Sequence, residues 1–483
     1  MPGFHVEHFG CRAARADGEA VSHRLRAAGL AEQGPSAADV VVVNTCSVTA
    51  EADRAARAFI RRAHRLNPEA RIVVTGCYAQ RAPAELAGLA GVAAVVGNSH
   101  KALAPEIILG AVRGGVGAIA PPELVSVQAL VTGNGGPRQA PIWVDDRFAH
   151  SFMEESQLAP GAQTRPNLKI QEGCGNRCTF CVIPQTRGSS RSLPAEAVMR
   201  QVEGFAAAGG NELVLSGINL GRWGWDLPFS ADGSNRRQRP TLAALVRRIF
   251  DETALPRLRL SSIEPMDWNA ELIGLMGEFG GTRLARHAHL PLQSGSDAVL
   301  RRMHRRYRPW HYAEKVQALL KAAGEELTLG ADVMVGFPGE TDAEFEETAA
   351  LIRALPFGYL HLFPFSPRPG TPGWSLHAER PVRAAVVDER MKLLRTLAAQ
   401  KSETHRKRFV GRDLEVVTLH TPAELAARGM TAALSENFLP IEIAGQLPAN
   451  RLVRVRVTGE TSAGTLLGAA ENADGPVSGS SPS

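Results

Sequence analysis

The six cysteines of this chain restrict its fold more than any other feature, because they form two sets of three. They lie at Cys11, Cys46 and Cys77, and at Cys174, Cys178 and Cys181. The N-terminus has no charged-then-apolar leader and no apolar run reaches membrane-spanning length, so we expect a cytoplasmic protein. Thiols stay reduced in that compartment, which argues against a disulfide framework. The cysteines are therefore candidate metal ligands.

The first 100 residues alternate apolar strand patterns with segments of helical length. The strand-like runs are FHVEHFGC, DVVVVNTC, RIVVTGC and GVAAVVGN, and this alternation predicts a doubly wound parallel α/β domain. Three of the four runs end in a cysteine, and the carboxyl ends of parallel strands share one edge of a sheet. We therefore expect the three N-terminal cysteines to converge in space; three buried structural thiols are the alternative.

The 483 residues are too many for one core and predict about two to four domains. A second β/α repeat begins at LKIQEG, and its six strand candidates predict an open (β/α)6 partial barrel, with a full eightfold barrel as the alternative. From about residue 410, short β-rich pieces predict a small β-barrel. The expected boundaries are 1–105 for the N-terminal domain, 106–160 for a linker, 161–400 for the barrel, 401–468 for the β-barrel and 469–483 for a disordered tail.

The Cys-x-x-x-Cys-x-x-Cys loop follows the first strand candidate of the partial barrel. Three thiolates on a short loop can bind three irons of a [4Fe–4S] cluster and leave the fourth iron open to another ligand. Structural zinc normally takes four protein ligands, and no fourth Cys or His follows at finger spacing. The loop therefore favours an iron–sulfur cluster with an open coordination position.

The stretch LKIQEGCGNRCTFCVIPQTRGSSRS resembles the signature of radical S-adenosylmethionine enzymes, and in particular that of the methylthiotransferases among them. The resemblance extends over about residues 3–465. In that family a three-cysteine domain precedes the radical barrel, and a small RNA-binding β-barrel, the TRAM domain, follows it. The resemblance implies two [4Fe–4S] clusters. The loop cysteines would hold the radical cluster, whose open iron binds S-adenosylmethionine, and the N-terminal cysteines would hold an auxiliary cluster, whose open iron binds the sulfur that is transferred.

Further cofactor contacts are expected at the carboxyl ends of the barrel strands, where such folds place their active sites. The candidates for contacts to S-adenosylmethionine are Ser216, Gly217, Glu264, Gln293, Gly336 and Gly339. Ordinary turn glycines and a capping Glu264 are the alternatives, and no catalytic residue is assigned. Two stretches depart from the family pattern: Arg-Ala-Ala follows Cys11 in place of a run with Asn at its third position, and TAALSENFLPI matches the TRAM stretch only loosely.

Basic residues recur where a polyanion can dock. The net charge is +5. Candidate RNA contacts are Arg54, Arg57, Arg61 and Arg65, which helical spacing places on one face, and Arg187 after the cysteine loop. RRMHRRYR at 301–308 and HRKR at 405–408 are further basic clusters. Any one of them is typical of a solvated face, but their combination with an RNA-binding module favours an RNA substrate.

The stretch NTCSVTAEADRAAR, followed by NPEARIVVTGCYAQ, is most similar to the branch of the family that acts on N6-threonylcarbamoyladenosine beside the anticodon of tRNA. That likeness implies a methylthio group added at C2 of the base. The alternatives are isopentenyladenosine in tRNA, an aspartate of a ribosomal protein, or a non-catalytic iron–sulfur RNA-binding protein. The expected partners are a tRNA anticodon stem-loop, an electron donor and a sulfur source, without a membrane, and the chain is expected to be a monomer.

Overall fold

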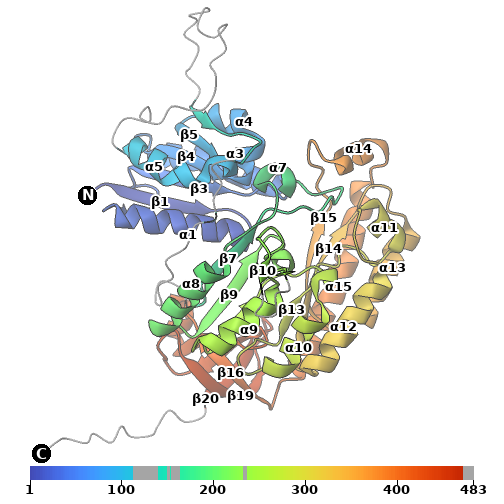
Figure 1. Cartoon of the computed structure of the whole chain (residues 1–483). Helices are drawn as coiled ribbons and strands as arrows, with labels where there is room; N and C mark the ends of the chain where they lie inside the picture. The colour runs from blue at the N-terminus through green and yellow to red at the C-terminus, as the bar shows by residue number, and fades with distance from the viewer. Residues whose placement is uncertain (113–139, 149–152, 154–163, 232–236, 471–483) are drawn as a thin grey trace, which may run out of the picture.

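Three folded parts follow one another along the chain (Figure 1). The computed structural model describes residues 1–112, 140–148, 153, 164–231 and 237–470. None of the helices among these residues has both the length and the apolar character needed to cross a membrane. The parts are an N-terminal α/β domain, a central β/α barrel and a C-terminal β-barrel, in the order expected from the sequence.

The N-terminal domain is built on a parallel sheet with the strand order β2-β1-β3-β4-β5-β6. The strands are β1 (Gly3–His8), β2 (Ala31–Glu32), β3 (Val40–Thr45), β4 (Arg71–Gly76), β5 (Val92–Gly97) and β6 (Ile142–Trp143). Strand β3 is buried along its whole length, as a central strand covered on both faces must be. Val40 and Val42 belong to one apolar core, and Val41 and Val43 to the other.

Helices cover both faces of this sheet, so the expected doubly wound arrangement is confirmed. They are α1 (Arg12–Ala27), α2 (Ala50–Leu66), α3 (Cys77–Arg81), α4 (Pro83–Ala87), η1 (Asn98–Leu103) and α5 (Ala104–Val112). Residues of α1 and α5 pack on the face of Val40, and residues of α2, α3 and α4 pack on the face of Val41. The hydroxyl of Thr49 accepts a hydrogen bond from the amide of Ala52, which caps the start of α2 as its sequence predicts.

The segment expected as a linker, 106–160, contains two elements of the N-terminal domain. Helix α5 continues to Val112 because Ile107, Ile108 and Ala111 are buried against the sheet. Strand β6 pairs with β5 and buries Trp143 completely. The stretches VRGGVGAIAPPE and TGNGGPRQAP, whose glycines and prolines predict a linker, lie almost entirely outside the described residues.

The central part is an open barrel of six parallel strands, as predicted, and not a full eightfold barrel. The strands are β7 (Asn167–Glu172), β9 (Glu212–Gly217), β12 (Arg257–Leu260), β13 (His287–His289), β14 (Thr328–Val335) and β15 (Phe357–Pro364). They form a sheet ordered β12-β9-β7 and a sheet ordered β13-β14-β15, which a parallel bridge between Leu258 and Leu284 links. The short β8 (Arg191–Ser192) pairs antiparallel with β7 at the edge.

Helices on the outside of the barrel share one continuous apolar core with its strands. These helices are α8 (Ala195–Ala207), α9 (Leu242–Glu252), α10 (Ala270–Phe279), α11 (Asp297–Arg302), α12 (Pro309–Ala323), α13 (Asp342–Ala354), α14 (Pro372–Glu379) and α15 (Ala384–Lys407). The short helix α7 (Ile183–Arg187) instead contacts α3 and η1 of the N-terminal domain. Three-residue turns η3 (Leu220–Arg222) and η4 (Pro265–Asp267) and a two-stranded ribbon of β10 (Ser230–Ala231) and β11 (Arg237–Gln238) complete this part.

The C-terminal part is a closed β-barrel with the strand order β16-β17-β18-β20-β19. Its elements are β16 (Asp413–Thr418), α16 (Ala423–Ala427), β17 (Met430–Ser435), β18 (Pro440–Ala444), β19 (Leu452–Glu460) and β20 (Leu466–Ala470). The barrel is confirmed. The sequence patterns DLEVVTLHT, FLPIEIAG and RLVRVRVTGE predict the strands β16, β18 and β19, and the structure adds β17 and β20. The expected disordered tail, 469–483, begins within β20, and its remainder lies outside the described residues.

Candidate functional site

The three N-terminal cysteines follow three neighbouring strands of the first sheet. Cys11 comes after β1 and precedes the first residue of α1, Cys46 follows β3 directly, and Cys77 follows β4 and opens α3. Because β1, β3 and β4 are adjacent and parallel, their carboxyl ends bring these cysteines to one edge of the sheet. Cys46 and Cys77 are buried and Cys11 is exposed, so the triad lies where the domain meets its surroundings.

The backbone before Cys11 passes very close to Cys46. Gly10 has a φ of +113°, and a Cβ atom placed on it would stand 2.4 Å from Cys46 Cβ and 2.7 Å from its sulfur. Only glycine tolerates both this dihedral angle and this approach. Burial, together with the nearby Cys77 and Cys11, raises the pKa of the Cys46 thiol to about 12. Cys11 and Cys77 are thus close enough to Cys46 to act on its thiol electrostatically.

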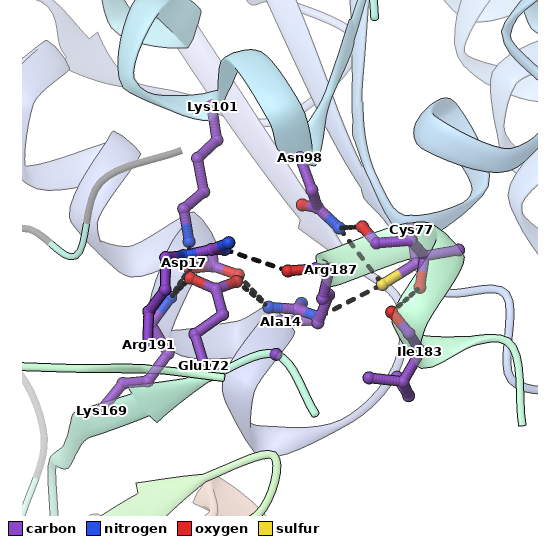
Figure 2. A network of polar contacts seen from close by, with 12 residues as sticks. Ala14, Asp17, Cys77, Asn98, Lys101, Lys169, Glu172, Ile183, Arg187 and Arg191 are labelled. Atoms are coloured by element: carbon purple, nitrogen blue, oxygen red, sulfur yellow. Dashed lines mark hydrogen bonds and ion pairs between the residues drawn. The ribbon is translucent and has the colours of Figure 1, made fainter. Parts of the chain in front are cut away.

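The sulfur of Cys77 accepts hydrogen bonds from two buried side chains (Figure 2). Arg187 donates from Nε at 3.3 Å, and Asn98, directly after β5, donates from Nδ2 at 3.4 Å. Asn98 also donates to the carbonyl of Thr186 at 2.8 Å, which ties the N-terminal domain to helix α7 of the barrel. Donors of this kind stabilise a thiolate and tune a metal site from outside its ligand set.

Arg187 does not belong to an RNA-binding surface, contrary to the expectation from the sequence. Its side chain is fully buried at the junction of the two domains. It pairs with Glu172 of β7 at 2.6 Å and with Asp17 of α1 at 3.0 Å. A guanidinium held in this way has no access to a phosphate group.

The cysteine loop of the barrel follows β7, at the carboxyl end of that strand. Gly173 has a φ of +71°, and a Cβ on it would lie 1.9 Å from the carbonyl oxygen of Ser189, so glycine is required before Cys174. The Cys174 sulfur accepts from the amide of Asn176 at 3.4 Å and from Asn219 Nδ2 at 3.6 Å. Burial raises the pKa of Cys181 to about 12.

A cavity of about 700 Å³ is lined by all three loop cysteines, together with residues that include Arg177, Gln185 and Arg191. This volume lies in the range of sites that enclose a small molecule. A second cavity of about 260 Å³ adjoins it, with Cys178, Glu264, Arg305 and Arg306 on its walls. The loop cysteines therefore face enough space for a cluster and a bound small molecule.

The donor set fits iron–sulfur clusters better than a single metal ion. Among the residues that the structure describes, no three Cys, His, Asp or Glu side chains converge closely enough to ligate one ion. The ligands of a cluster bind separate irons, whereas zinc ligands converge on one atom. In addition, Nη2 of Arg187 is buried without a hydrogen-bond partner in the described part of the chain. This unpaired donor belongs to the side chain that contacts Cys77, and a sulfide of a cluster bound there would be an acceptor for it.

The six residues expected to contact S-adenosylmethionine all lie at or just beyond the carboxyl ends of β9, β12, β13 and β14. Only Glu264 lines either of the two cavities among the described residues. Ser216 is buried and its hydroxyl donates to the carbonyl of Leu168, and Gly217 lies against the side chain of Gln171. The amide of Gly336 donates to Glu340, and that of Gly339 donates to the carbonyl of Arg380.

Gln293 combines two unusual properties. It is buried and has a φ of +63°, which is uncommon for any residue other than glycine and is concentrated at functional sites. Its side-chain oxygen has no hydrogen-bond partner within the described residues. An unsatisfied buried acceptor at the end of a barrel strand is a candidate ligand contact.

The basic clusters are more extensively paired than the sequence suggests. In α2, Arg54 pairs with Glu51, and Arg57 contacts both Glu85 and Tyr78, whereas Arg61 and Arg65 are exposed. In the clusters at 301–308 and 405–408, the paired side chains are Arg301, Arg302, Arg305, Arg306, Arg308, Arg406, Lys407 and Arg408. Arg305 and Arg306 of the first cluster line the smaller cavity beside Cys178.

Sequence reasoning missed several residues that the structure places at the site. Arg305 donates to Cys178 at 3.4 Å and to both carboxylate oxygens of Glu264. Trp225 is exposed, with the guanidinium of Arg222 4.1 Å and that of Arg239 5.3 Å from its ring centroid, and Arg222 pairs with Asp267. The one available signal was the glycine directly before Cys11, Cys77 and Cys174, which marks tight loops but not their polar partners.

Comparison with known proteins agrees with this geometry. Residues 3–97 match the family model described as uncharacterized protein family UPF0004, and residues 168–352 match that of the radical SAM superfamily. The threonylcarbamoyladenosine tRNA methylthiotransferase MtaB of Bacillus subtilis (strain 168) is 33% identical over 94% of this chain and 93% of its own. The tRNA-2-methylthio-N(6)-dimethylallyladenosine synthase of Novosphingobium aromaticivorans is 33% identical over 86% of each chain.

A solved structure of the radical S-adenosylmethionine methyltransferase TsrM from Kitasatospora setae shares the fold, with a TM-score of 0.52 and 16% identity over 78% of this chain and 75% of that one. The threonylcarbamoyladenosine tRNA methylthiotransferase MtaB of Thermotoga maritima, 31% identical over 99% of each chain, extends over both cysteine triads and all three folded parts. The chain therefore belongs to the family of radical S-adenosylmethionine tRNA methylthiotransferases.

Proposed function

We propose that this enzyme adds a methylthio group to C2 of N6-threonylcarbamoyladenosine beside the anticodon of tRNA. The observation that carries the chemistry is the pair of cysteine triads, each with hydrogen-bond donors to its sulfurs. Helix α7 connects the two triads, because it begins two residues after Cys181 and its last residue, Arg187, contacts Cys77. The observation that supports the substrate is the likeness over 94% of the chain to an enzyme named for threonylcarbamoyladenosine.

In this proposal the N-terminal triad holds the auxiliary [4Fe–4S] cluster and the loop triad holds the radical [4Fe–4S] cluster. When bound, these clusters and S-adenosylmethionine supply the reductive cleavage, the sulfur and the methyl group that C2 of the base requires. The residues of the chain hold the thiolates apart at two sites, and the fold shields Cys46 and Cys77 from water. Each triad leaves one coordination position for chemistry.

Two of the expected contact residues, Glu264 and Gln293, fit the polar end of S-adenosylmethionine best. Glu264 lies on the cavity beside Cys178 and is held in place by Arg305. Gln293 offers its unsatisfied oxygen to an ammonium or hydroxyl group of the cofactor. Ser216 and Gly217 border the site through Gln171, whereas Gly336 and Gly339 have amides already engaged and serve as turns that shape the loop.

The RNA contacts in this proposal come from two surfaces. Arg61 and Arg65 on the exposed face of α2 fit phosphate groups. Trp225 and Phe229 are exposed by 42% and 55%, and Arg239 lies over both rings. Arg222, which contacts Trp225, pairs with Asp267, and Arg306 on the wall of the smaller cavity also pairs with Asp267. This aromatic surface next to the site fits an unpaired base of the anticodon loop.

A second candidate substrate is isopentenyladenosine at the same position of tRNA. It is supported by the relative named for N(6)-dimethylallyladenosine, which is also 33% identical to this chain. The chemistry and the site residues would be the same, so the two candidates differ only in the group on N6 that the site accepts.

Reaction with two synthetic anticodon stem-loops tests the proposal. One RNA carries N6-threonylcarbamoyladenosine and the other isopentenyladenosine, and nucleoside mass spectrometry measures the methylthio product after reaction with the reconstituted enzyme. We expect product from the first RNA and little from the second. Product only from the second RNA would overturn the substrate assignment while leaving the chemistry intact.

Two variants test the division of labour between the triads. Cys46→Ala is expected to keep forming 5′-deoxyadenosine from S-adenosylmethionine and to lose sulfur insertion, whereas Cys178→Ala is expected to lose both. Normal sulfur insertion by Cys46→Ala would contradict the role given to the N-terminal triad.

A further inference from the structure

A buried network of ion pairs joins the N-terminal domain to the barrel directly behind Cys77 (Figure 2). It consists of Asp17 on α1, Lys101 on η1, Lys169 and Glu172 on β7, and Arg187 on α7. Arg187 and Glu172 are fully buried, and the other three side chains are between 10% and 17% exposed. The network is therefore largely shielded from solvent, where charges interact strongly.

The network holds three cations against two carboxylates, so one positive charge is in excess. Burial alone would raise the pKa of Glu172, but Lys101, Lys169 and Arg187 outweigh it and lower that pKa well below the usual value. Burial lowers the pKa of Lys101 to about 8, which still leaves it charged at neutral pH. A buried excess charge is costly unless a partner of opposite sign lies nearby.

The contacts of Arg187 indicate that a compensating negative charge would lie beside Cys77. Arg187 donates a hydrogen bond from Nε to the Cys77 sulfur, and its Nη1 donates to carboxylate oxygens of Glu172 and Asp17. Its Nη2 has no partner in the described part of the chain. A cluster held by three thiolates at Cys11, Cys46 and Cys77 would provide both the compensating negative charge and a sulfide acceptor for Nη2.

We propose that Arg187 is a positioning residue that neutralises the auxiliary cluster and raises its reduction potential. A cationic donor stabilises the reduced cluster more than the oxidised one, because reduction adds one negative charge to the cluster. Arg187 lies six residues after Cys181, on the helix that the radical loop leads into. The same side chain therefore links the environment of one cluster to the backbone that carries the other. The inference rests on the proposed cluster at the N-terminal triad.

Redox titration of the reconstituted full chain, followed by electron paramagnetic resonance, tests this role. In Arg187→Gln the equilibrium constant for reducing the auxiliary cluster should fall by about tenfold or more, equivalent to about 59 mV per factor of ten for one electron. Arg187→Lys keeps the positive charge, so its equilibrium constant for reducing the auxiliary cluster should stay much closer to that of the parent chain. Signals are assigned with a chain in which Cys174, Cys178 and Cys181 are all replaced by Ala.

Two further variants provide matched controls. Asp17→Asn removes one carboxylate from the network and should shift the auxiliary potential in the opposite direction, upward. Arg305→Gln removes the corresponding donor to Cys178 and should lower the potential of the radical cluster alone. If Arg187 had only a structural role, Arg187→Gln and Asp17→Asn would not shift the potential of the auxiliary cluster in opposite directions.

The inference fails if Arg187→Gln leaves the auxiliary potential unchanged or shifts both clusters equally, or if Arg187→Lys fails to retain the cluster. Failure of the part of the proposed function on which this inference rests, the cluster at the N-terminal triad, gives a different result, because the parent chain would then hold iron for only one cluster. An iron count on the parent and on Cys46→Ala separates the two failures before any titration.

Discussion

Arg305 donates a hydrogen bond to the sulfur of Cys178 at 3.4 Å. Its other terminal nitrogen holds both carboxylate oxygens of Glu264, at 2.8 and 2.6 Å. Arg187 has the same relationship to Cys77 and to the carboxylates of Asp17 and Glu172. Each cysteine triad thus has one buried arginine that is itself fixed by carboxylates, so that the donor to the sulfur is preorganised.

We expect Trp225→Ala to weaken binding of an anticodon stem-loop by about 1–3 kcal/mol, because a base stacked on an aromatic ring contributes roughly that amount. Fluorescence anisotropy with a labelled RNA measures the effect, and Trp225→Phe should retain most of the affinity. Leu393→Ala is the control, since Leu393 is also 42% exposed but lies on α15. Equal losses in the Trp225 and Leu393 variants would speak against a stacking surface.

The double variant Arg61→Gln, Arg65→Gln should flatten the dependence of tRNA affinity on salt. Loss of two phosphate contacts is expected to reduce the slope of log K against log salt by about 1.4–1.8. Arg247→Gln serves as the control, because this exposed arginine of α9 pairs with Glu278. An unchanged slope would assign the exposed face of α2 to ordinary solvation.

The sequence predicted the secondary-structure elements and the positions of the two cysteine triads much better than the side chains that surround the cysteines. Strand patterns and cysteine positions located both triads, because apolar periodicity and the geometry of parallel sheets are local rules. The hydrogen-bond partners of Cys77 and Cys178 could not be predicted, because Arg187 and Arg305 are 110 and 127 residues away from them in the chain. In a sequence, a buried arginine cannot be distinguished from a solvent-exposed one, because only the tertiary structure determines which residues surround it.

Two short strands, β6 and β20, were not predicted from the sequence for a related reason. The strand β6 has two residues, and it was assigned to a linker because its neighbourhood is rich in glycine and proline. Its pairing with β5 and the burial of Trp143 depend on a sheet assembled from residues some fifty positions earlier. Strand β20 likewise exists because the barrel must close between β18 and β19.

Glu212→Gln is expected to destabilise the chain by about 3–5 kcal/mol, because it leaves buried guanidinium groups without their counter-charge. Glu212 is fully buried and contacts Arg165, Arg257 and Arg259 at 2.7, 3.3 and 2.8 Å. Burial would raise its pKa, but these arginines outweigh burial and lower the pKa to about 2. Chemical denaturation measures the change in the free energy of unfolding.

A matched control for this prediction is Glu196→Gln, which removes an exposed carboxylate paired with Arg248. Exposed pairs contribute little, so no measurable change is expected. Arg257 and Arg259 also contact Glu415 and the carbonyl of Ser435 in the C-terminal barrel. Glu212→Gln should therefore also increase proteolysis between α15 and β16, and a chain that resists cleavage as well as the parent would contradict this link.

His405 is expected to make the stability of the fold depend on pH between about 7 and 4. It is buried, its Nε2 lies 2.8 Å from the Thr328 hydroxyl, and burial, with Arg408 and Arg406, lowers its pKa to about 4. The unfolded chain, with a pKa near 6.5 at this residue, binds the proton first as the pH falls. Stability contributed by neutral His405 is thus present above pH 6.5 and is lost progressively toward pH 4.

Urea denaturation at pH 7 and pH 5 checks this expectation. From the two pKa values, the parent should lose about 2 kcal/mol of unfolding free energy through His405 over this interval. His405→Gln lacks the titrating group, so its loss over the same interval should be smaller by about that amount. Parallel losses in the two proteins would show that His405 is protonated equally in the folded and unfolded states, which contradicts its burial between α15 and β14.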